Sequence, residues 1–241
     1  MQPGLYVSLS SQLALDRRLT TLADNVANAT TVGFRATEVK FNQVVSDTRT
    51  AKVAFVSEGQ EFISTKNGGF TETGGMLDFA IKGDAWFSVQ TPAGPTLTRD
   101  GRFTLTNDGQ LVTINGYPVL DVGGAPIQIN AQQGALTLSA DGQLNQNGQP
   151  VAAIGLFQAD LSGGFTRAGN SGIIPTLQPE PVVDRIDAGV MQGYIEESNV
   201  NAISEMTQLI TVTRAFESVA SLIRDSETSL DEAVRTLGGS Q

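Results

Sequence analysis

Carboxylates are the only side chains in this 241-residue sequence whose spacing suits acid–base catalysis. Two pairs qualify, Glu196 with Glu197 and Asp184 with Asp187. Glycosidases use two such acids on opposite sides of a cleft, one as an acid and the other as a nucleophile or base. Both pairs lie beside a proline-rich segment or the start of a predicted helix, where solvated charge is the simpler interpretation. We therefore expect neither pair to be catalytic.

The composition excludes most other catalytic sites. The sequence contains no His and no Cys, which rules out Ser-His-Asp triads, Cys-His nucleophiles, thiolate zinc sites and disulfides. Glycine is frequent, but no phosphate-binding glycine motif opens a predicted helix. Trp86 is the only tryptophan, and a lone Trp in a β-rich run is more typical of a core than of a ligand site. We expect no enzymatic activity, no cofactor and no metal.

The charge and the hydropathy limit the partners. The formal net charge of −10 disfavours a nucleic-acid backbone or an anionic membrane surface. No window approaches the roughly 18 apolar residues that a membrane-spanning helix requires. The start of the chain lacks the basic and apolar regions of a secretory signal. We expect a protein that binds no nucleic acid, does not insert directly into a membrane, and has no cleaved signal peptide.

Each end of the chain carries a long helical pattern that needs a partner surface. Apolar residues from Met206 to Leu237 are separated alternately by three and four positions, which predicts a helix that begins at Asn199 or Asn201. The same spacing predicts a helix over 4–29. Such spacing is typical of a coiled-coil seam. The candidate partner-binding residues on these seams are Leu15, Leu19, Leu22, Val26, Met206, Leu209, Phe216, Ala220, Ile223, Leu230 and Val234.

The seams have a second possible explanation, since the two terminal helices could pair only with each other inside one chain. Charges of both signs are interspersed along the C-terminal helix and could fix its register against several neighbouring helices. Glu227 lies on the seam itself, where a dry pairing of two helices would bury it. These features favour assembly with other helices.

The middle of the chain is typical of β-structure. Asp-Gly and Asn-Gly pairs recur, and both favour tight hairpin turns. Asp108-Gly109, for example, separates two runs, 102–106 and 110–114, in which apolar and polar residues alternate. We predict an α+β fold in which the two long helices pair as a coiled-coil-like stem and a central all-β domain forms a barrel or sandwich. The predicted regions are 1–36 (helix), 37–68 (extended linker), 69–190 (β-domain) and 191–241 (helix).

Three segments resemble the motifs of bacterial flagellar rod and hook proteins. They are LADNVANATTVGFR at 22–35, a central segment within 71–103 that includes TGGMLDFAIKG and TRDGRF, and GYIEESNVN at 193–201 with its continuation to 217. The resemblance implies a structural subunit of the periplasmic basal-body rod. Such a subunit assembles with copies of itself and with other rod proteins, and the rod transmits motor torque to the hook. It also implies export by the flagellar type III apparatus without a cleaved signal.

Within that family the length fits a rod protein better than a hook protein. The opening Gly4-Leu5-Tyr6-Val7 looks most like a proximal-rod member, and a distal-rod or hook-type subunit is the alternative. An alternative from another class is a secreted carbohydrate-active enzyme built on the β-domain. That enzyme would need a cleft with two acids about 5 to 9 Å apart.

Overall fold

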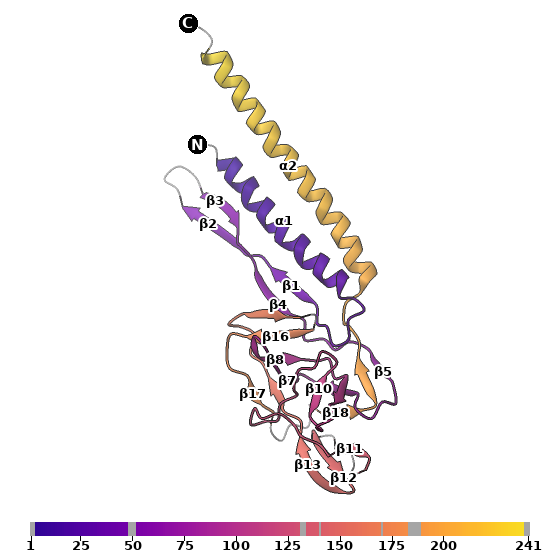
Figure 1. Ribbon diagram of the computed structural model, residues 1–241. Coiled ribbons are helices and arrows are strands. Elements are labelled where there is room, and N and C mark those ends of the chain that lie inside the picture. Colours follow the sequence, from indigo (N-terminus) through magenta and orange to yellow (C-terminus); the bar gives the residue numbers. More distant parts are fainter. Residues whose placement is uncertain are drawn as a thin grey trace. The chain divides into compact units, whose positions relative to one another are not determined.

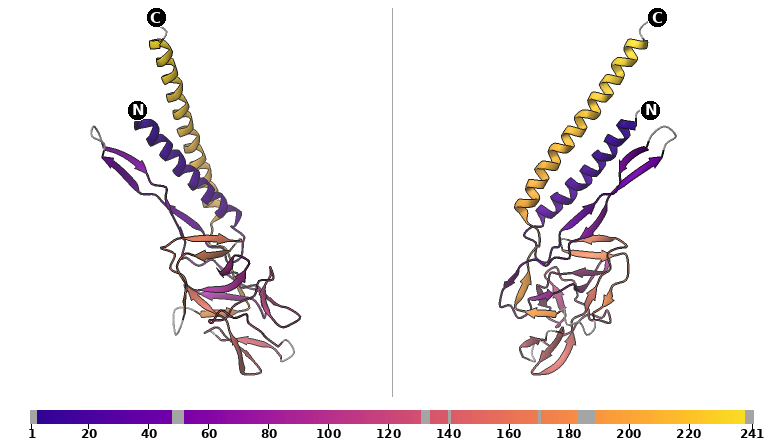
Figure 2. Two further views of the ribbon diagram at one scale, coloured as in Figure 1. Left: turned by 60° about the vertical axis from the view of Figure 1, so that its left-hand side comes forward. Right: turned by 180° about the vertical axis from the view of Figure 1, so that it is seen from behind.

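The fold combines two long helices with many short strands and is α+β, as predicted (Figures 1 and 2). It divides into two compact units. The first contains Thr37–Phe62 and both ends of the chain, up to Ala27 and from Asn201, and the second contains Asn28–Ala36 and Ile63–Val200. The computed structural model describes residues 3–47, 52–130, 134–139, 141–169, 171–182 and 189–238.

The first unit is built on helices α1 (Pro3–Ala27) and α2 (Ala202–Gly238), which lie side by side and antiparallel (Figure 1). The side chain of Asn201 caps α2, because its Oδ1 accepts a hydrogen bond from the backbone N of Ser204 at 3.1 Å. Asn201, rather than Asn199, is therefore the cap of the predicted C-terminal helix. Neither described helix has a stretch long and apolar enough to cross a membrane.

Paired strands form inside residues 37–68, which were predicted as an extended linker. Strand β1 (Thr37–Lys40) pairs with β4 (Gln60–Ile63), and β2 (Gln43–Asp47) forms a hairpin with β3 (Lys52–Val56). The hairpin contacts α1, since the backbone N of Val56 donates to the Oγ of Ser10 at 3.4 Å.

The second unit is dominated by an open six-stranded sheet. Its edge strands are β15 (Phe165–Ala168) and β17 (Glu180–Pro181), so it does not close into a barrel. Trp86 begins one of its central strands and is buried, which confirms its prediction as a core residue. In spatial order, the strands are β15 (Phe165–Ala168), β16 (Gly172–Pro175), β8 (Gly94–Thr98), β7 (Trp86–Thr91), β14 (Leu156–Gln158) and β17 (Glu180–Pro181).

Smaller antiparallel sheets complete this unit, and none of those described closes on itself, so the barrel alternative is wrong. Asp108-Gly109 joins β9 (Phe103–Leu105) to β10 (Leu111–Thr113) as the sequence predicted. Asn147-Gly148 joins β12 (Gln143–Gln146) to β13 (Gln149–Ala153), with positive φ at both residues. The two-stranded sheets are β5 (Phe70–Glu72) with β19 (Tyr194–Glu196), β6 (Phe79–Lys82) with β18 (Gly189–Gln192), and β9 with β10. Strands β11 (Leu136–Leu138), β12 and β13 form a three-stranded sheet.

Residues from the six-stranded sheet and from the smaller sheets together form the core of the second unit. Phe79, Phe87 and Phe103 pack with their rings tilted or edge-on, at centroid distances of 5.9 and 5.2 Å. Strands β5 and β6, near the start of the unit, pair with β19 and β18 at its end. The fold of this unit is therefore complete only when residues 189–196 are in place.

Candidate assembly surface and motif junction

Helices α1 and α2 bury one face of each helix inside the first unit. On α2 the packed face centres on Val212, which is 8% exposed, and on α1 it includes Leu22 at 6%. Val212 is absent from the predicted seam, although it follows Leu209 at helical spacing. The predicted partner-binding residues that lie half-buried are Leu15, Leu19, Val26, Leu209, Phe216, Ala220 and Ile223.

Beyond Ser226 this face continues but nothing in the described chain covers it. Leu230, Val234 and Leu237 lie in line with the packed face, and all three are exposed, Val234 at 68% and Leu237 at 81%. The reason is length: α2 has 37 residues and α1 has 25, so α2 is about 18 Å longer. Its C-terminal end continues past α1 (Figure 1). An uncovered apolar face on a solvent-exposed helix indicates an interaction surface.

A second set of apolar side chains is exposed near the other end of α2. Ile203, Met206 and Ile210 follow one another at i, i+3 and i+7, so they share one face of the helix, and none is buried. Met206, predicted on the seam, thus lies outside the packed face. On α1 the corresponding exposed set is Tyr6, Leu9 and Leu13.

Asn25 connects three elements of the first unit and was not among the predicted site residues. Its Nδ2 donates to the carbonyl of Thr37 at 2.9 Å, its Oδ1 accepts from the N of Thr37 at 3.0 Å, and Nδ2 also lies 3.2 Å from the Oε2 of Glu205. Asn25 is 2% exposed. Its side-chain amide hydrogen-bonds the backbone of β1 as a neighbouring strand would. Its position inside the ADNVAN motif was the only sequence signal.

The second unit contains a buried ionic junction formed by residues far apart in the chain. The Oε2 of Glu196 accepts a hydrogen bond from the Nε of Arg99 at 2.7 Å, and its Oε1 lies 3.0 Å from the Nη2 of Arg35. None of the three side chains is more than 2% exposed. Glu196 was predicted as solvated charge, and this is wrong because two guanidinium groups satisfy it inside the fold. Its neighbour Glu197 is exposed, while Asp184 and Asp187 lie outside the described residues.

Backbone carbonyls bind most of the remaining donors of Arg99. Its Nη1 donates to the carbonyl of Gly83 at 2.9 Å and to that of Ala85, and its Nη2 donates to the carbonyl of Ile81 at 2.9 Å. Arg99 therefore stabilises the β6–β7 turn in addition to binding Glu196.

Arg35 is held less completely. Its Nη2 donates to the Oδ1 of Asn67 at 2.7 Å, but its Nε has no partner among the described residues. Burial lowers the pKa of Arg35 to about 10, and the nearby charge of Arg99 acts in the same direction, while Glu196 opposes both.

Backbone segments that lead to the two helices meet at the same junction. The N of Gly33 donates to the carbonyl of Glu196 at 2.7 Å, and the N of Asn199 donates to the carbonyl of Phe34 at 3.3 Å. The side chain of Asn199 accepts from the N of Ala36 at 2.7 Å and donates to the carbonyl of Lys66 at 2.8 Å. The junction therefore ties the segment after α1 to the segment before α2.

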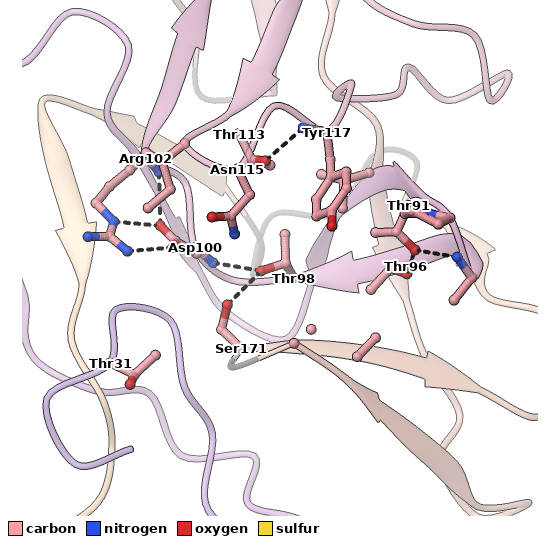
Figure 3. A pocket seen from close by; sticks show the side chains of 17 residues that line it. Thr31, Thr91, Thr96, Thr98, Asp100, Arg102, Thr113, Asn115, Tyr117 and Ser171 are labelled. Atoms are coloured by element: carbon pink, nitrogen blue, oxygen red, sulfur yellow. Dashed lines mark hydrogen bonds and ion pairs between the residues drawn. The ribbon is translucent and has the colours of Figure 1, made fainter. Parts of the chain in front are cut away.

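A groove in the second unit is a candidate ligand cavity, and it does not support the enzyme alternative (Figure 3). Asp100 is the only carboxylate among the described residues that line it, and both its oxygens accept hydrogen bonds from Arg102, at 2.9 and 2.7 Å. A two-acid mechanism needs a second carboxylate at this place. In the described part of the chain, no three acidic side chains gather as they would around a metal ion.

Comparison with known proteins agrees with the motifs. Three family models match: the flagella basal body rod protein model at residues 5–35, the flagellar hook protein FlgE/F/G D1 domain at 80–146, and the flagellar basal body rod FlgEFG protein C-terminal model at 191–236. The flagellar basal-body rod protein FlgF of Rhizobium meliloti is 66% identical over the full length of both chains. The chain belongs to the flagellar basal-body rod protein family.

More distant rod proteins align along nearly the whole chain as well. FlgF of Mesorhizobium japonicum is 56% identical over 99% of both chains, and FlgG of Bacillus subtilis is 28% identical over 97% of this chain and 98% of its own. These rod proteins are structural proteins rather than enzymes.

Each of the three rod-family matches supplies one member of the buried junction. Arg35 is the last residue of the first match, Arg99 lies in the second, and Glu196 lies in the third. The sequence segments that identify this rod protein therefore meet at one place in its fold.

Proposed function

We propose that this chain is a structural subunit of the proximal part of the flagellar basal-body rod. It polymerises through its terminal helices into the helical drive shaft that transmits motor torque to the hook. Its partners are copies of itself and other rod proteins. It reaches the periplasm through the flagellar type III export apparatus without a cleaved signal peptide, and its two terminal helices pair as a coiled-coil-like stem.

The single observation that carries this proposal is the uncovered end of α2. Leu230, Val234 and Leu237 extend the face that α1 covers elsewhere, but α1 is too short to reach them. A helix from another subunit can cover them at the same spacing. Because such a contact joins two different surfaces of the subunit, it can repeat from one subunit to the next and build an open helical filament.

The predicted partner-binding residues fall into two roles under this proposal. The residues that are buried between α1 and α2 stabilise the helix pair. They thereby position the surface that contacts neighbouring subunits. Direct contact with a neighbour is assigned to the exposed members, Met206, Leu230 and Val234, together with the exposed set on α1. Substitution of Leu22 or Phe216 by Asp would consequently disturb the helix pair itself before any assembly step.

The test uses the exposed end of α2. Leu230→Asp combined with Val234→Asp places two charges on the proposed contact, and a charge buried without a partner costs several kcal/mol. We expect the variant to be absent from basal bodies purified from the native bacterium, and the cells to be non-motile. Circular dichroism of the free protein should be unchanged, because both side chains are exposed in the single chain.

Ser229→Asp is the matched control, since Ser229 is exposed on the same turn but points away from the apolar face. It should incorporate normally. Normal incorporation of the Leu230→Asp/Val234→Asp variant would contradict the assignment of this surface.

A further inference from the structure

The groove of the second unit has the size of a small-ligand site and has no role in the helix contacts. Its volume is about 610 Å³, within the usual range for pockets that bind small molecules. Its rim is formed by the β7–β8 turn around Pro92, by the turn at 113–117 that carries Tyr117, and by the β15–β16 hairpin near Ser171 (Figure 3).

Seven of the described residues that line the groove carry a hydroxyl group, and apolar side chains and glycines supply most of the rest. Thr96 and Thr98 form its floor at 2% and 5% exposure, so their positions are fixed by the sheet. The Oγ1 of Thr98 lies 3.1 Å from the Oγ of Ser171, and the Oγ1 atoms of Thr91 and Thr96 are 3.0 Å apart. The hydroxyl-bearing residues that line it are Thr31, Thr91, Thr96, Thr98, Thr113, Tyr117 and Ser171.

The charged pair in the groove is neutralised internally. Arg102 donates to both carboxylate oxygens of Asp100, and the N of Arg102 lies 3.2 Å from the Oδ1 of the same carboxylate. This guanidinium is therefore engaged, and the described residues bring no other cationic side chain to the groove. The lining consequently favours an uncharged polar ligand over a phosphate or a carboxylate.

Two groups in the groove remain available to a ligand. The hydroxyl of Tyr117 and the side-chain amide of Asn115 have no hydrogen-bond partner in the part of the chain that the structure describes, and both lie at the groove (Figure 3). Tyr117 is half-buried, so its ring is held in place while one end reaches the groove. A fixed aromatic ring beside hydroxyl and amide groups offers an apolar face and a polar edge to the same ligand.

We propose that this groove binds a neutral oligosaccharide. The C–H face of one sugar ring packs on Tyr117, and the sugar hydroxyls exchange hydrogen bonds with Asn115 and with the threonine and serine hydroxyls. The volume fits about two sugar rings, so longer chains extend beyond the rim. The groove binds without cleaving, because a single carboxylate, already paired with Arg102, cannot supply the two acids of a glycosidase.

The experiment titrates the full-length protein with cellotetraose, maltotetraose and chitotetraose and follows backbone amide signals by NMR. We expect saturable shifts at Thr98, Asn115 and Ser171 with at least one of the three sugars. Tyr117→Ala should weaken that binding about tenfold, whereas Tyr117→Phe, which keeps the ring, should weaken it only about threefold. Leu177→Ala, an exposed residue outside the groove, is the control and should bind as the parent protein does.

Three outcomes would overturn the proposal. One is the absence of saturable shifts with all three sugars at millimolar concentration. Another is binding that Tyr117→Ala leaves unchanged in a protein whose circular dichroism is that of the parent. The third is a response of the groove signals to an unstructured peptide but not to any sugar, which would assign the groove to a polypeptide.

Discussion

The Nε of Arg99 lies 2.7 Å from the Oε2 of Glu196, and both side chains are essentially inaccessible to solvent. These residues are 97 positions apart in the chain. Because Glu196 also binds Arg35, a single carboxylate compensates two buried guanidinium groups. Removing one charge from such a site leaves the others buried without a counter-ion, which is far more costly than losing an exposed ion pair.

Glu196→Gln should therefore lower the free energy of unfolding by about 3 kcal/mol or more. The amide keeps the size of the carboxylate but leaves two cations without a negative charge. Urea unfolding followed by the fluorescence of Trp86, which is buried in the same unit, measures the change. The adjacent Glu197 supplies the control, since it is exposed and its Oε1 accepts a hydrogen bond from the Oγ1 of Thr71 at 2.6 Å. Glu197→Gln should change the stability by about 0.5 kcal/mol or less, and equal effects of the two substitutions would refute the junction as described.

Arg35→Met should be less harmful in the Glu196→Gln background than in the parent protein. In the parent it removes a partner of Glu196, whereas in the Gln variant it removes one of two uncompensated cations. The double-mutant cycle should give a coupling of about 1 to 3 kcal/mol. Strict additivity of the two substitutions would show that Arg35 and Glu196 do not interact as the 3.0 Å distance indicates.

The elements of this fold were largely predictable, because their signals are local. Helical spacing predicted a helix over 4–29, and the structure has Pro3–Ala27. Asp108-Gly109 predicted the β9–β10 hairpin for the same reason, since a tight turn is specified by two adjacent residues. Val212 was missed because the predicted seam took one residue at each step of three or four positions. The packed face of α2 is wider than that seam and includes Val212 as well.

The junction was not predictable from periodicity. Glu196 and Glu197 are identical neighbours in the sequence, yet one is buried and the other is exposed. Strands alternate their side chains between two faces, and which face is buried depends on the pairing of β19 with β5, from the other end of the unit. Only the motifs indicated that Arg35, Arg99 and Glu196 belong to related segments, and they gave no sign that these segments touch.

Asn25→Ala should destabilise the helix pair by about 2 kcal/mol, because it leaves the N and the carbonyl of Thr37 without the partners that Asn25 provides. Hydrogen exchange of the Thr37 amide, normally protected by the Oδ1 of Asn25, should become much faster. Thr20→Ala on the exposed side of α1 is the control, and it should leave this exchange rate unchanged. An unchanged rate in Asn25→Ala would mean that another group protects Thr37.

Gly33→Ala and Gly116→Ala form a matched pair that separates two costs in stability, that of the backbone conformation and that of steric crowding. Both glycines have positive φ, +69° for Gly33 and +82° for Gly116, so each substitution should cost about 1 kcal/mol from conformation alone. A Cβ on Gly33 would also lie 2.3 Å from the N of Asp100 and 2.4 Å from the backbone C of Arg99, whereas one on Gly116 meets nothing within 4 Å. Backbone atoms cannot move aside as a flexible side chain can, so the segment carrying Arg35 would have to separate from the segment carrying Arg99.

We expect Gly33→Ala to lower the free energy of unfolding by about 3 kcal/mol and Gly116→Ala by about 1 kcal/mol, both measured by urea unfolding. Equal losses would show that residues 33–35 do not pack against Arg99 as closely as the junction requires.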